Sequence, residues 1–390
     1  MTTLQKYRNI LIITGEVSGD MQAGYMLKAL KQRDPSLKVY AVGSDNLQAA
    51  GAEIVKDLTK KSTIGFLEAI KHVPSLLLLK NKLVKFLDEK KIDLLICVDY
   101  QGFNMIMAAE ARKRKIHVVY YIPPQEWVWG SDKGMQKVVN IVDKVVTIFK
   151  AEFDCYKKFT SQAGYFGHPL VQVIENYFKE NKKIKPAGTC QVAVFPGSRK
   201  QEIKYIFPEM IKIMSYMAEM DKNIKFVINL PNAHYQEEIE QGIKAIKQDI
   251  PVLIGKNYQV LKESKFALIT SGTICLEASI IGIPHVVLYK FGNLSYKIIR
   301  RVLAKKFKFK HYSLTNIVAG KEVVKEYLQH INAKEVGDFI LDNLQDKDKL
   351  EVIKNELKSI KEKLQIEGKT NILESIAEYI LEPNGYCAPR

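Results

Sequence analysis

No stretch of the sequence approaches the roughly 20 consecutive apolar residues that a membrane-spanning helix needs. We therefore expect a chain that does not cross a bilayer. Residues 1–20 also lack the apolar core and the cleavage site of a secretory signal, and their short apolar run, ILIIT, is typical of a first strand.

Cysteine is scarce: the chain has five. They lie far apart and form no CxxC pair and no Cys/His cluster. This pattern predicts reduced thiols, a cytoplasmic chain and no metal centre built on cysteine. A literal D-x-D occurs at residues 346–348, but it lies in the charged run QDKDKLEVIKNELK, which we interpret as a solvated linker. We therefore expect neither a metal ion nor a cofactor.

Composition indicates a globular chain with basic character. At 390 residues and 47% hydrophobic content, the chain can bury a large core and is long enough for two domains. Its formal net charge of +16 favours polyanions: nucleic acid, an anionic membrane surface or phosphorylated substrates. A nucleic-acid-binding protein would show steeply salt-dependent binding, but no RRM, KH or helix-turn-helix signal is present, and we expect no nucleic-acid partner.

Short apolar runs alternate with helical patterns along most of the chain, which predicts βαβ units on parallel sheets. The rhythm restarts after the Lys-rich stretch KENKKIKPAG, at residues 179–188. The sequence thus predicts one Rossmann-like α/β domain over residues 1–180 and a second over 181–345. The helical segment 346–390 is expected to return to the first domain. Ligands of such sheets bind at the carboxyl ends of strands, so the strand-to-helix turns are the candidate sites.

The first of these turns is TGEVSGD, at residues 14–20. Gly15 and Gly19 allow a tight turn and a close approach of a ligand, and the following helix start would present N–H groups to an anion. An ordinary βα turn in which Ser18 or Asp20 caps the helix explains the same residues.

Two further turns follow neighbouring apolar runs. Asp99 comes directly after DLLICV, where a carboxylate can act as a general base or can cap the next helix. The second turn, PPQEWVW, contains Trp127 and Trp129, the only two tryptophans of the chain. They could line a sugar or acyl site or simply belong to the core.

In the second half, the run VAVF leads into PGSR. Arg199 beside a helix start suits a diphosphate, because the guanidinium and the free N–H groups can both donate to its oxygens. The run FALIT leads into Ser271, Gly272 and Thr273, whose hydroxyls and N–H groups could hold phosphate, while Glu277 could accept both ribose hydroxyls. The alternative is a capped amphipathic helix with Glu277 at the surface.

Together these motifs resemble those of lipid-A-disaccharide synthases, glycosyltransferases of the two-Rossmann-domain GT-B class. The resemblance is carried by GE-x-SGD at 15–20, GHPL at 167–170, PGSR-x-x-EI at 196–203, SGT-x-x-LEA-x-x-x-x-x-P at 271–284 and S-L-x-N at 313–316. It covers nearly the whole chain and implies a GT-B fold, two Rossmann-like domains facing across a cleft, with the C-terminal helices packing back toward the first.

Two departures from the family pattern concern the acceptor side. The family commonly has D-x-P-D-F-N where this chain has residues 99–104, so Gly102 replaces the second carboxylate. The motif S-P-x-V-W-A-W appears here as PPQEWVW. These changes leave open an altered acceptor choice or a catalytically weakened paralogue that retains nucleotide binding.

The resemblance implies transfer of 2,3-diacylglucosamine from UDP to the 6-hydroxyl of 2,3-diacylglucosamine 1-phosphate (lipid X), with inversion, to give the β(1→6) disaccharide and UDP. Asp99 is the implied base. The implied nucleotide-sugar contacts are Ser198, Arg199, Ser271, Gly272, Thr273, Glu277 and Asn316. The implied acceptor contacts are Gly15, Glu16, Ser18, Gly19, Asn104, Gln125 and Trp127. A UDP-N-acetylglucosamine 2-epimerase is the nearest alternative enzyme.

Both substrates carry acyl chains, which implies work at the cytoplasmic face of the inner membrane by a peripheral monomer or homodimer. Two segments suit a membrane surface: an apolar helix face with Phe66, Leu67, Ile70, Leu76 and Leu77, and the basic-aromatic stretch 296–311. A buried helix and a solvated face, respectively, are the alternatives. We expect His168, in GHPL, to be a structural residue of the domain junction and His285 to belong to the core.

Overall fold

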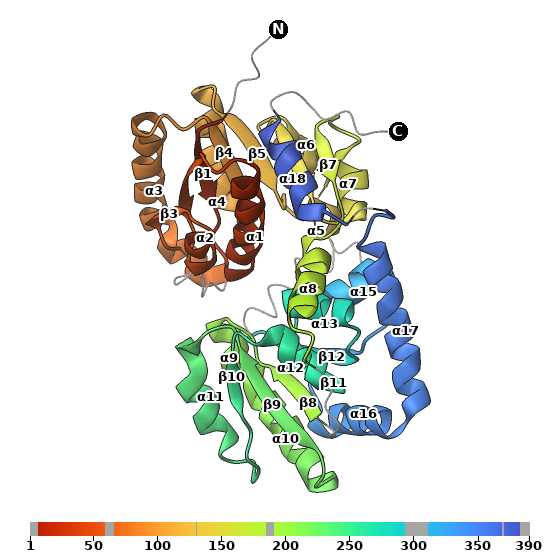
Figure 1. The fold of residues 1–390 in the computed structure, drawn as a ribbon. Helices are drawn as coiled ribbons and strands as arrows, with labels where there is room; N and C mark the ends of the chain where they lie inside the picture. The colour runs from red at the N-terminus through yellow and green to blue at the C-terminus, as the bar shows by residue number, and fades with distance from the viewer. Residues whose placement is uncertain are drawn as a thin grey trace. The chain divides into compact units, whose positions relative to one another are not determined.

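The computed structural model describes residues 7–58, 66–129, 131–184, 191–292, 311–368 and 370–382. Only the backbone is described at 66–73 and 129. The chain forms two compact units, of which unit 1 comprises 1–172 with 364–390 and unit 2 comprises 173–363. The sequence pattern places the divisions after residues 180 and 345. Each unit is built on one parallel sheet (Figure 1).

Within the described residues, the sheet of unit 1 has seven strands in the order β3-β2-β1-β4-β5-β6-β7. The strands are β1 Asn9–Ile13, β2 Lys38–Val42, β3 Glu53–Lys56, β4 Leu94–Val98, β5 His117–Tyr121, β6 Lys144–Thr147 and β7 Ala163–Tyr165. All five residues of β4 are buried, because helices cover both faces of a doubly wound sheet.

The helices of unit 1 follow its strands in sequence. They are α1 Val17–Arg33, α2 Asp45–Ala49, α3 Phe66–Glu89, α4 Gln101–Lys113, α5 Glu126–Trp129, α6 Asp132–Val139 and α7 Lys150–Tyr156. Leu83 of α3, Phe103 of α4 and Met135 of α6 pack with Leu11 and Tyr120 of the sheet in one apolar core. The next helix, α8 Pro169–Glu180, contains the division between the units.

Unit 2 repeats this architecture, with six described strands in the order β10-β9-β8-β11-β12-β13. Its strands are β8 Gln191–Phe195, β9 Lys225–Leu230, β10 Val252–Ile254, β11 Phe266–Thr270, β12 His285–Tyr289 and β13 Glu326–Leu328. Its helices are α9 Lys200–Tyr205, α10 Phe207–Met220, η2 Ala233–Tyr235, α11 Gln236–Ile243, α12 Asn257–Glu263, α13 Thr273–Ile281, α15 Leu314–Ala319, α16 Ala333–Gln345 and α17 Lys347–Lys363. The predicted pair of doubly wound domains is confirmed.

The last described helix, α18 Ile372–Leu381, belongs to unit 1 and lies beside α1 (Figure 1). Arg33 at the end of α1 pairs with Glu378 at 2.7 Å. The buried Lys144 ammonium donates to the carbonyl oxygen of Tyr379 at 2.5 Å and to that of Glu382. By contrast, α17 packs on α13 and α15 within unit 2. The return of a C-terminal helix to the N-terminal domain is thus confirmed for α18.

Candidate functional site

Both sheets reverse their strand order at one point, between β1 and β4 in unit 1 and between β8 and β11 in unit 2. Open α/β sheets bind ligands outside the carboxyl ends of the strands at such a switch point. The turns after these four strands contain most of the predicted site residues. The topology therefore gathers them into one candidate site in each unit.

The two glycines of the first turn serve close packing in unit 1. A Cβ added to Gly15 would lie 2.5 Å from the Tyr100 ring, and one added to Gly19 would lie 2.3 Å from Thr14 Oγ1. Glu16 is the N-cap residue of α1, and no side chain caps this helix, so the predicted capping by Ser18 or Asp20 is wrong. Glu16 and Ser18 are half-buried, which leaves both side chains within reach of a ligand.

Asp20 has a different task, in which its buried carboxylate ties α1 to the loop after β2. It accepts from the main-chain N–H of Ser44 at 2.6 Å and from that of Asn46 at 3.0 Å. The Asn46 side-chain amide adds a bond of 2.9 Å. Asp20 therefore fixes the β1–α1 turn to the loop after β2.

Asp99 lies in a left-handed turn after β4, where Asp99 and Tyr100 both have φ of 48°. Two consecutive residues in this region are strained, at about 1–3 kcal/mol each. The turn is fixed by bonds to the main chain of Asp99: its N–H donates to the Ile122 carbonyl oxygen, and its own carbonyl oxygen accepts from Tyr120 Oη at 2.8 Å. The N-cap residue of α4 is Tyr100 and makes no side-chain cap bond, so Asp99 is not the N-cap residue that the alternative reading predicted.

Asn104 is fully buried below this turn. Its amide nitrogen donates to the Asp99 carbonyl oxygen at 2.7 Å and lies 3.2 Å from the carbonyl oxygens of Ile13 and Val98. The side chain thus joins the ends of β1 and β4 and positions the main chain of Asp99. A Cβ added to Gly102 would meet no atom within 4 Å, so the position has space beside it.

Glu152, near the start of α7, is a buried carboxyl group that sequence reasoning missed. Burial raises its pKa to about 8, the N–H groups of Ile148 and Phe149 lower it, and the neighbouring Asp99 carboxylate raises it further. Its one sequence signal is an acidic residue between two aromatic residues, Phe149 and Phe153.

The other predicted residues of unit 1 divide between surface and core. Gln125 is half-buried, whereas Trp127 is 5% exposed and packs against Phe149 with ring centroids 5.6 Å apart. The side chain of Trp129 lies outside the described residues. His168 is buried, accepts from the Leu170 N–H and has its pKa lowered by burial to about 3, as suits a structural residue.

In unit 2, the carboxylate of Glu202 binds the main chain of the PGSR turn. Glu202 Oε2 accepts from the N–H of Ser198 at 2.7 Å and from that of Arg199 at 3.0 Å. Gly197, with φ of 105°, is required here, since a Cβ on it would lie 2.2 Å from the same oxygen. The N–H groups predicted to bind a diphosphate are therefore held by Glu202. The Arg199 side chain, 47% exposed and 3.5 Å from Glu202 Oε1, remains as the cation of this turn.

The start of α13 is the more open anion site. Gly272 is its N-cap, no side chain caps the helix, and a Cβ at Gly272 would meet no atom within 4 Å. Ser271 and Thr273 are half-buried on either side, and Ser271 Oγ lies 3.5 Å from the Tyr312 carbonyl oxygen. A nine-residue helix with an accessible N-terminus suits phosphate oxygens.

Glu277 lies one turn further along α13 and is 2% exposed, so its predicted alternative position at the surface is wrong. Burial raises its pKa to about 7, and a hydrogen bond from Asn257 Nδ2, 3.1 Å long, lowers it. Asn229 in turn bonds Asn257 at 2.6 Å. Sequence reasoning missed both asparagines; the available signal was Asn229, a polar residue next to the end of the apolar strand KFVINL.

Asn316 is fully buried and its amide is occupied by the protein. Its Nδ2 donates to the Val324 carbonyl oxygen at 2.8 Å and to Glu326 Oε1 at 2.9 Å. Its Oδ1 accepts from the N–H groups of Val323 and Val324. The structure thus shows Asn316 holding the turn between α15 and β13. His285 is likewise buried and lies 3.1 Å from Thr315 Oγ1, as predicted for a core residue.

The predicted membrane residues lie on α3, but the side chains of Phe66, Leu67 and Ile70 are outside the described residues, as is the stretch 293–310. Leu76 packs against the core. Leu77 is 54% exposed, and its neighbour Leu78 is 73% exposed. Among the described helices, none is long and apolar enough to cross a membrane.

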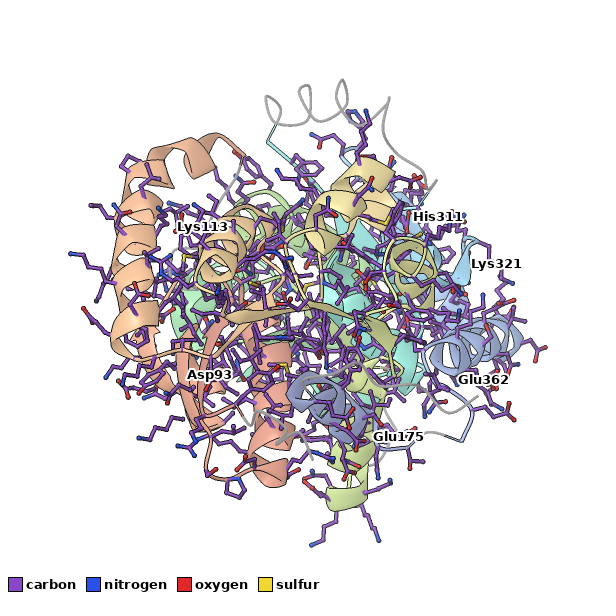
Figure 2. All side chains as sticks on the ribbon, turned by 90° about the horizontal axis from the view of Figure 1, so that it is seen from above. Asp93, Lys113, Glu175, His311, Lys321 and Glu362 are labelled. Atoms are coloured by element: carbon purple, nitrogen blue, oxygen red, sulfur yellow. The ribbon has the colours of Figure 1, made fainter. Side chains whose placement is uncertain are left out.

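Lysines project from the surface of both units (Figure 2), and carboxylates partner several of them. Lys113 lies 3.1 Å from Glu110, and Lys321 lies 2.8 Å from Glu356. No group of His, Cys, Asp and Glu in the described part of the chain could hold a metal ion. Asp346, of the D-x-D sequence, accepts from the N–H groups of Asp348 and Lys349 and so caps α17, which means that the interpretation of this run as a linker is wrong.

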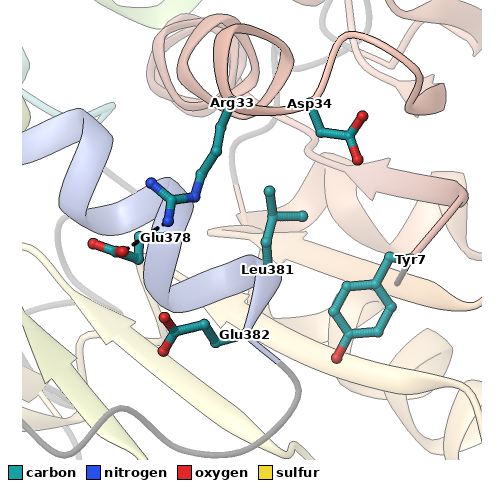
Figure 3. A pocket seen from close by; sticks show the side chains of 6 residues that line it. All are labelled: Tyr7, Arg33, Asp34, Glu378, Leu381 and Glu382. Atoms are coloured by element: carbon teal, nitrogen blue, oxygen red, sulfur yellow. Dashed lines mark hydrogen bonds and ion pairs between the residues drawn. The ribbon is translucent and has the colours of Figure 1, made fainter. Parts of the chain in front are cut away.

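A cavity of about 240 Å³ lies elsewhere in unit 1 (Figure 3). Its lining includes Tyr7, which precedes β1, and the Arg33–Glu378 pair at the end of α1. These positions lie at the amino ends of the strands. Asp99 lies at their carboxyl ends, so the cavity is no part of the candidate site.

Comparison with known proteins matches nearly the whole chain to one family. The family model described as lipid-A-disaccharide synthetase matches residues 10–380. A lipid-A-disaccharide synthase of Syntrophus aciditrophicus (strain SB) is 30% identical over 365 residues, which cover 92% of this chain and 94% of the relative.

Two solved structures show the same fold. A UDP-GlcNAc 2-epimerase from Neisseria meningitidis bound to UDP-GlcNAc has a TM-score of 0.59 at 14% identity, covering 96% of this chain and 98% of that one. A glycotransferase of kitacinnamycin has a TM-score of 0.60 at 12% identity, covering 97% and 100%. At such identities the likeness concerns the fold.

Proposed function

Because the chain belongs to the lipid-A-disaccharide synthetase family, we propose that it transfers 2,3-diacylglucosamine from UDP to the 6-hydroxyl of 2,3-diacylglucosamine 1-phosphate. The products are the β(1→6) disaccharide 1-phosphate and UDP. The observation that carries the proposal is the pair of switch points, one with Asp99 in its turn and the other with Arg199 and an uncapped helix start.

The reaction inverts the α-linked donor into a β-linked product, so one in-line displacement suffices. The acceptor hydroxyl attacks the anomeric carbon, the bond to the diphosphate oxygen breaks, and a base takes the hydroxyl proton. We assign that base to Asp99, since its turn is held at the carboxyl end of β4, at the switch point of the sheet. Such a base contributes about 10²–10⁴-fold to the rate.

The leaving diphosphate needs positive charge. We assign this task to the Arg199 guanidinium and to the N–H groups at the start of α13, with the hydroxyls of Ser271 and Thr273. Ser198 contributes by fixing the turn that carries Arg199, since its N–H group donates to Glu202. Glu277 is assigned to the ribose hydroxyls.

The residues assigned to the acceptor divide into those that contact the sugar and those that shape the site. Glu16, Ser18 and Gln125 are half-buried and are the side chains that we propose contact the acceptor sugar. Gly15, Gly19, Asn104 and Trp127 are buried, and we propose that they shape this site from within. Asn316 does the same for the nucleotide site.

Acylated substrates favour work at a membrane surface, and we propose peripheral attachment to the cytoplasmic face of the inner membrane through α3. Leu77 and Leu78 are exposed there, and Lys82 and Lys85 follow Leu78 at helical spacing. Apolar side chains beside lysines favour an interface with anionic lipids.

The test is to incubate the purified protein with UDP-2,3-diacylglucosamine and 2,3-diacylglucosamine 1-phosphate and to seek the disaccharide by mass spectrometry. Formation of disaccharide and UDP in equal amounts supports the proposal. A 2-acetamidoglycal formed from UDP-N-acetylglucosamine would indicate an epimerase instead. Binding of UDP without any product would indicate a weakened paralogue, in which Gly102 is the first position to replace by Asp.

A further inference from the structure

Three polar side chains form a row in unit 2, in which Asn229 and Glu277 are buried and Asn257 between them is half-buried. Asn229 lies near the end of β9 and is 1% exposed, Asn257 begins α12 after β10, and Glu277 lies in α13 after β11. β10, β9, β8 and β11 are neighbours in that order. The row therefore lies at the carboxyl ends of these strands, as the turn of Arg199 does. These side chains therefore belong to the surroundings of the nucleotide site.

The hydrogen bonds of this row run in one direction. The main-chain N–H of Lys256, which can only donate, donates to Asn229 Oδ1 at 2.9 Å. This bond fixes the orientation of the Asn229 amide, whose Nδ2 donates to Asn257 Oδ1 at 2.6 Å. Asn257 Nδ2 then donates to Glu277 Oε2 at 3.1 Å. The main chain thus sets the orientation of every group as far as the carboxylate.

The last bond matters because Glu277 is buried. A carboxylate can accept from two hydroxyls, whereas a protonated carboxyl group becomes a donor itself. Burial favours the protonated form, and the Asn257 donor favours the ionised one. Removing Asn257 would therefore release the carboxylate from its orientation and weaken it as an acceptor.

We propose that Asn257, oriented by Asn229, is a positioning residue that holds Glu277 toward the ribose hydroxyls and makes the site selective for ribonucleotides over 2′-deoxyribonucleotides. The inference rests on the nucleotide-binding role proposed above for Glu277. A nucleotide without the 2′-hydroxyl leaves a buried acceptor unpaired, which is costly.

The test is calorimetric binding of UDP and of 2′-deoxy-UDP to the full chain. We expect the wild type to bind UDP about 10- to 100-fold more tightly, as for a hydrogen bond to a charged group. In Asn257→Ala, UDP affinity should fall about tenfold while 2′-deoxy-UDP affinity changes by less than about threefold. The ratio of the two affinities is the readout, because a merely structural residue would lower both together.

The matched control is Asn343→Ala in α16, where a buried asparagine donates to the Phe339 carbonyl oxygen. This variant should be destabilised and keep the wild-type ratio. If Asn257→Ala does not fold, Asn257→Ser retains a short polar side chain and should show the same reduced ratio. An unchanged ratio in a folded Asn257 variant overturns the inference.

Two outcomes separate this inference from the proposed function. Equal binding of UDP and 2′-deoxy-UDP by the wild type overturns ribose selection and leaves the transferase proposal standing. No binding of UDP at all overturns both.

Discussion

The side-chain amide of Asn104 donates to the main-chain carbonyl oxygen of Asp99 at 2.7 Å, and the hydroxyl of Tyr120 donates to the same oxygen at 2.8 Å. Both donors come from buried residues on elements that flank β4. They hold in place a left-handed turn whose backbone is strained. Asn104 therefore acts on the proposed base through its backbone.

Asn104→Ala should lower kcat by about 10- to 100-fold, since misplacement of a catalytic group by about 1 Å costs on the order of 10²-fold. It should also lower the unfolding free energy by about 1–3 kcal/mol, because three carbonyl oxygens lose a buried donor. UDP affinity, a property of unit 2, should be unchanged. A variant that is destabilised but turns over at the wild-type rate would contradict the positioning role.

Asp99→Asn should lower kcat by about 10²–10⁴-fold with little change in UDP affinity. The amide keeps the shape of the carboxylate but cannot take a proton. Thermal stability should stay close to wild type, since the bonds that hold the turn are made by the main chain of Asp99, which the substitution keeps. Steady-state kinetics and UDP titration on this one variant are the measurement, and a kcat within tenfold of wild type would show that Asp99 is not the base.

Arg199→Ala should cost on the order of 2–4 kcal/mol of transition-state stabilisation, as for loss of one donor to a developing anion. The main-chain N–H groups of the turn cannot compensate, because Glu202 holds them. The measurement is kcat/KM for the UDP-sugar. The control is Lys212→Ala, which removes an exposed cation of α10 that also pairs with a carboxylate, that of Glu209. Activity of Arg199→Ala within threefold of the control would remove Arg199 from the site.

Glu277→Gln should change how stability depends on pH. Burial raises the pKa of Glu277 from 4.5 to about 7, so between these values the folded state keeps a proton that the unfolded state has lost. The stabilising contribution is complete below pH 4.5 and is lost as the pH rises through 7. The unfolding free energy of wild type minus that of Glu277→Gln should therefore fall by on the order of 3 kcal/mol across this interval.

Urea unfolding of both proteins from pH 4.5 to 8 measures this difference. Burial also raises the pKa of Glu152, to about 8, but that group titrates in both proteins and cancels in the subtraction. A difference that is constant with pH would show that Glu277 does not take up a proton in the folded state.

Leu77→Ser combined with Leu78→Ser should weaken binding to vesicles of anionic phospholipid while leaving the melting temperature near that of wild type, because both side chains are exposed. Leu79→Ala is the matched control: this neighbour is 8% exposed and should lose about 2–5 kcal/mol of stability instead. Vesicle cosedimentation is the measurement. Unchanged sedimentation of the double variant would remove α3 from the membrane-binding surface.

The sequence was sufficient to predict the two sheets and the turns that carry the site. Runs such as LLICV and FALIT are apolar throughout, as strands buried on both faces require, and the turn residues follow them directly. Position after a strand therefore located Asp99, Arg199 and Gly272.

Which way each side chain would face was harder to predict. Asn104 and Asn316 have the polarity of ligand contacts, yet each satisfies main-chain groups inside its own unit. Glu202 could not be identified as the partner of two N–H groups from spacing alone, and Glu152 became notable only through its burial. Such roles depend on tertiary hydrogen bonds, which leave little mark on local sequence.

Helix α18 gives the two units a fixed order of completion during synthesis. Residues 173–363 emerge from the ribosome as one uninterrupted unit, whereas unit 1 needs residues that precede this unit and residues that follow it. The surface of α1 and the buried Lys144 must therefore wait, uncovered, until α18 has been made. Unit 1 is begun first and finished last, so a chaperone that shields apolar surface would have its target there.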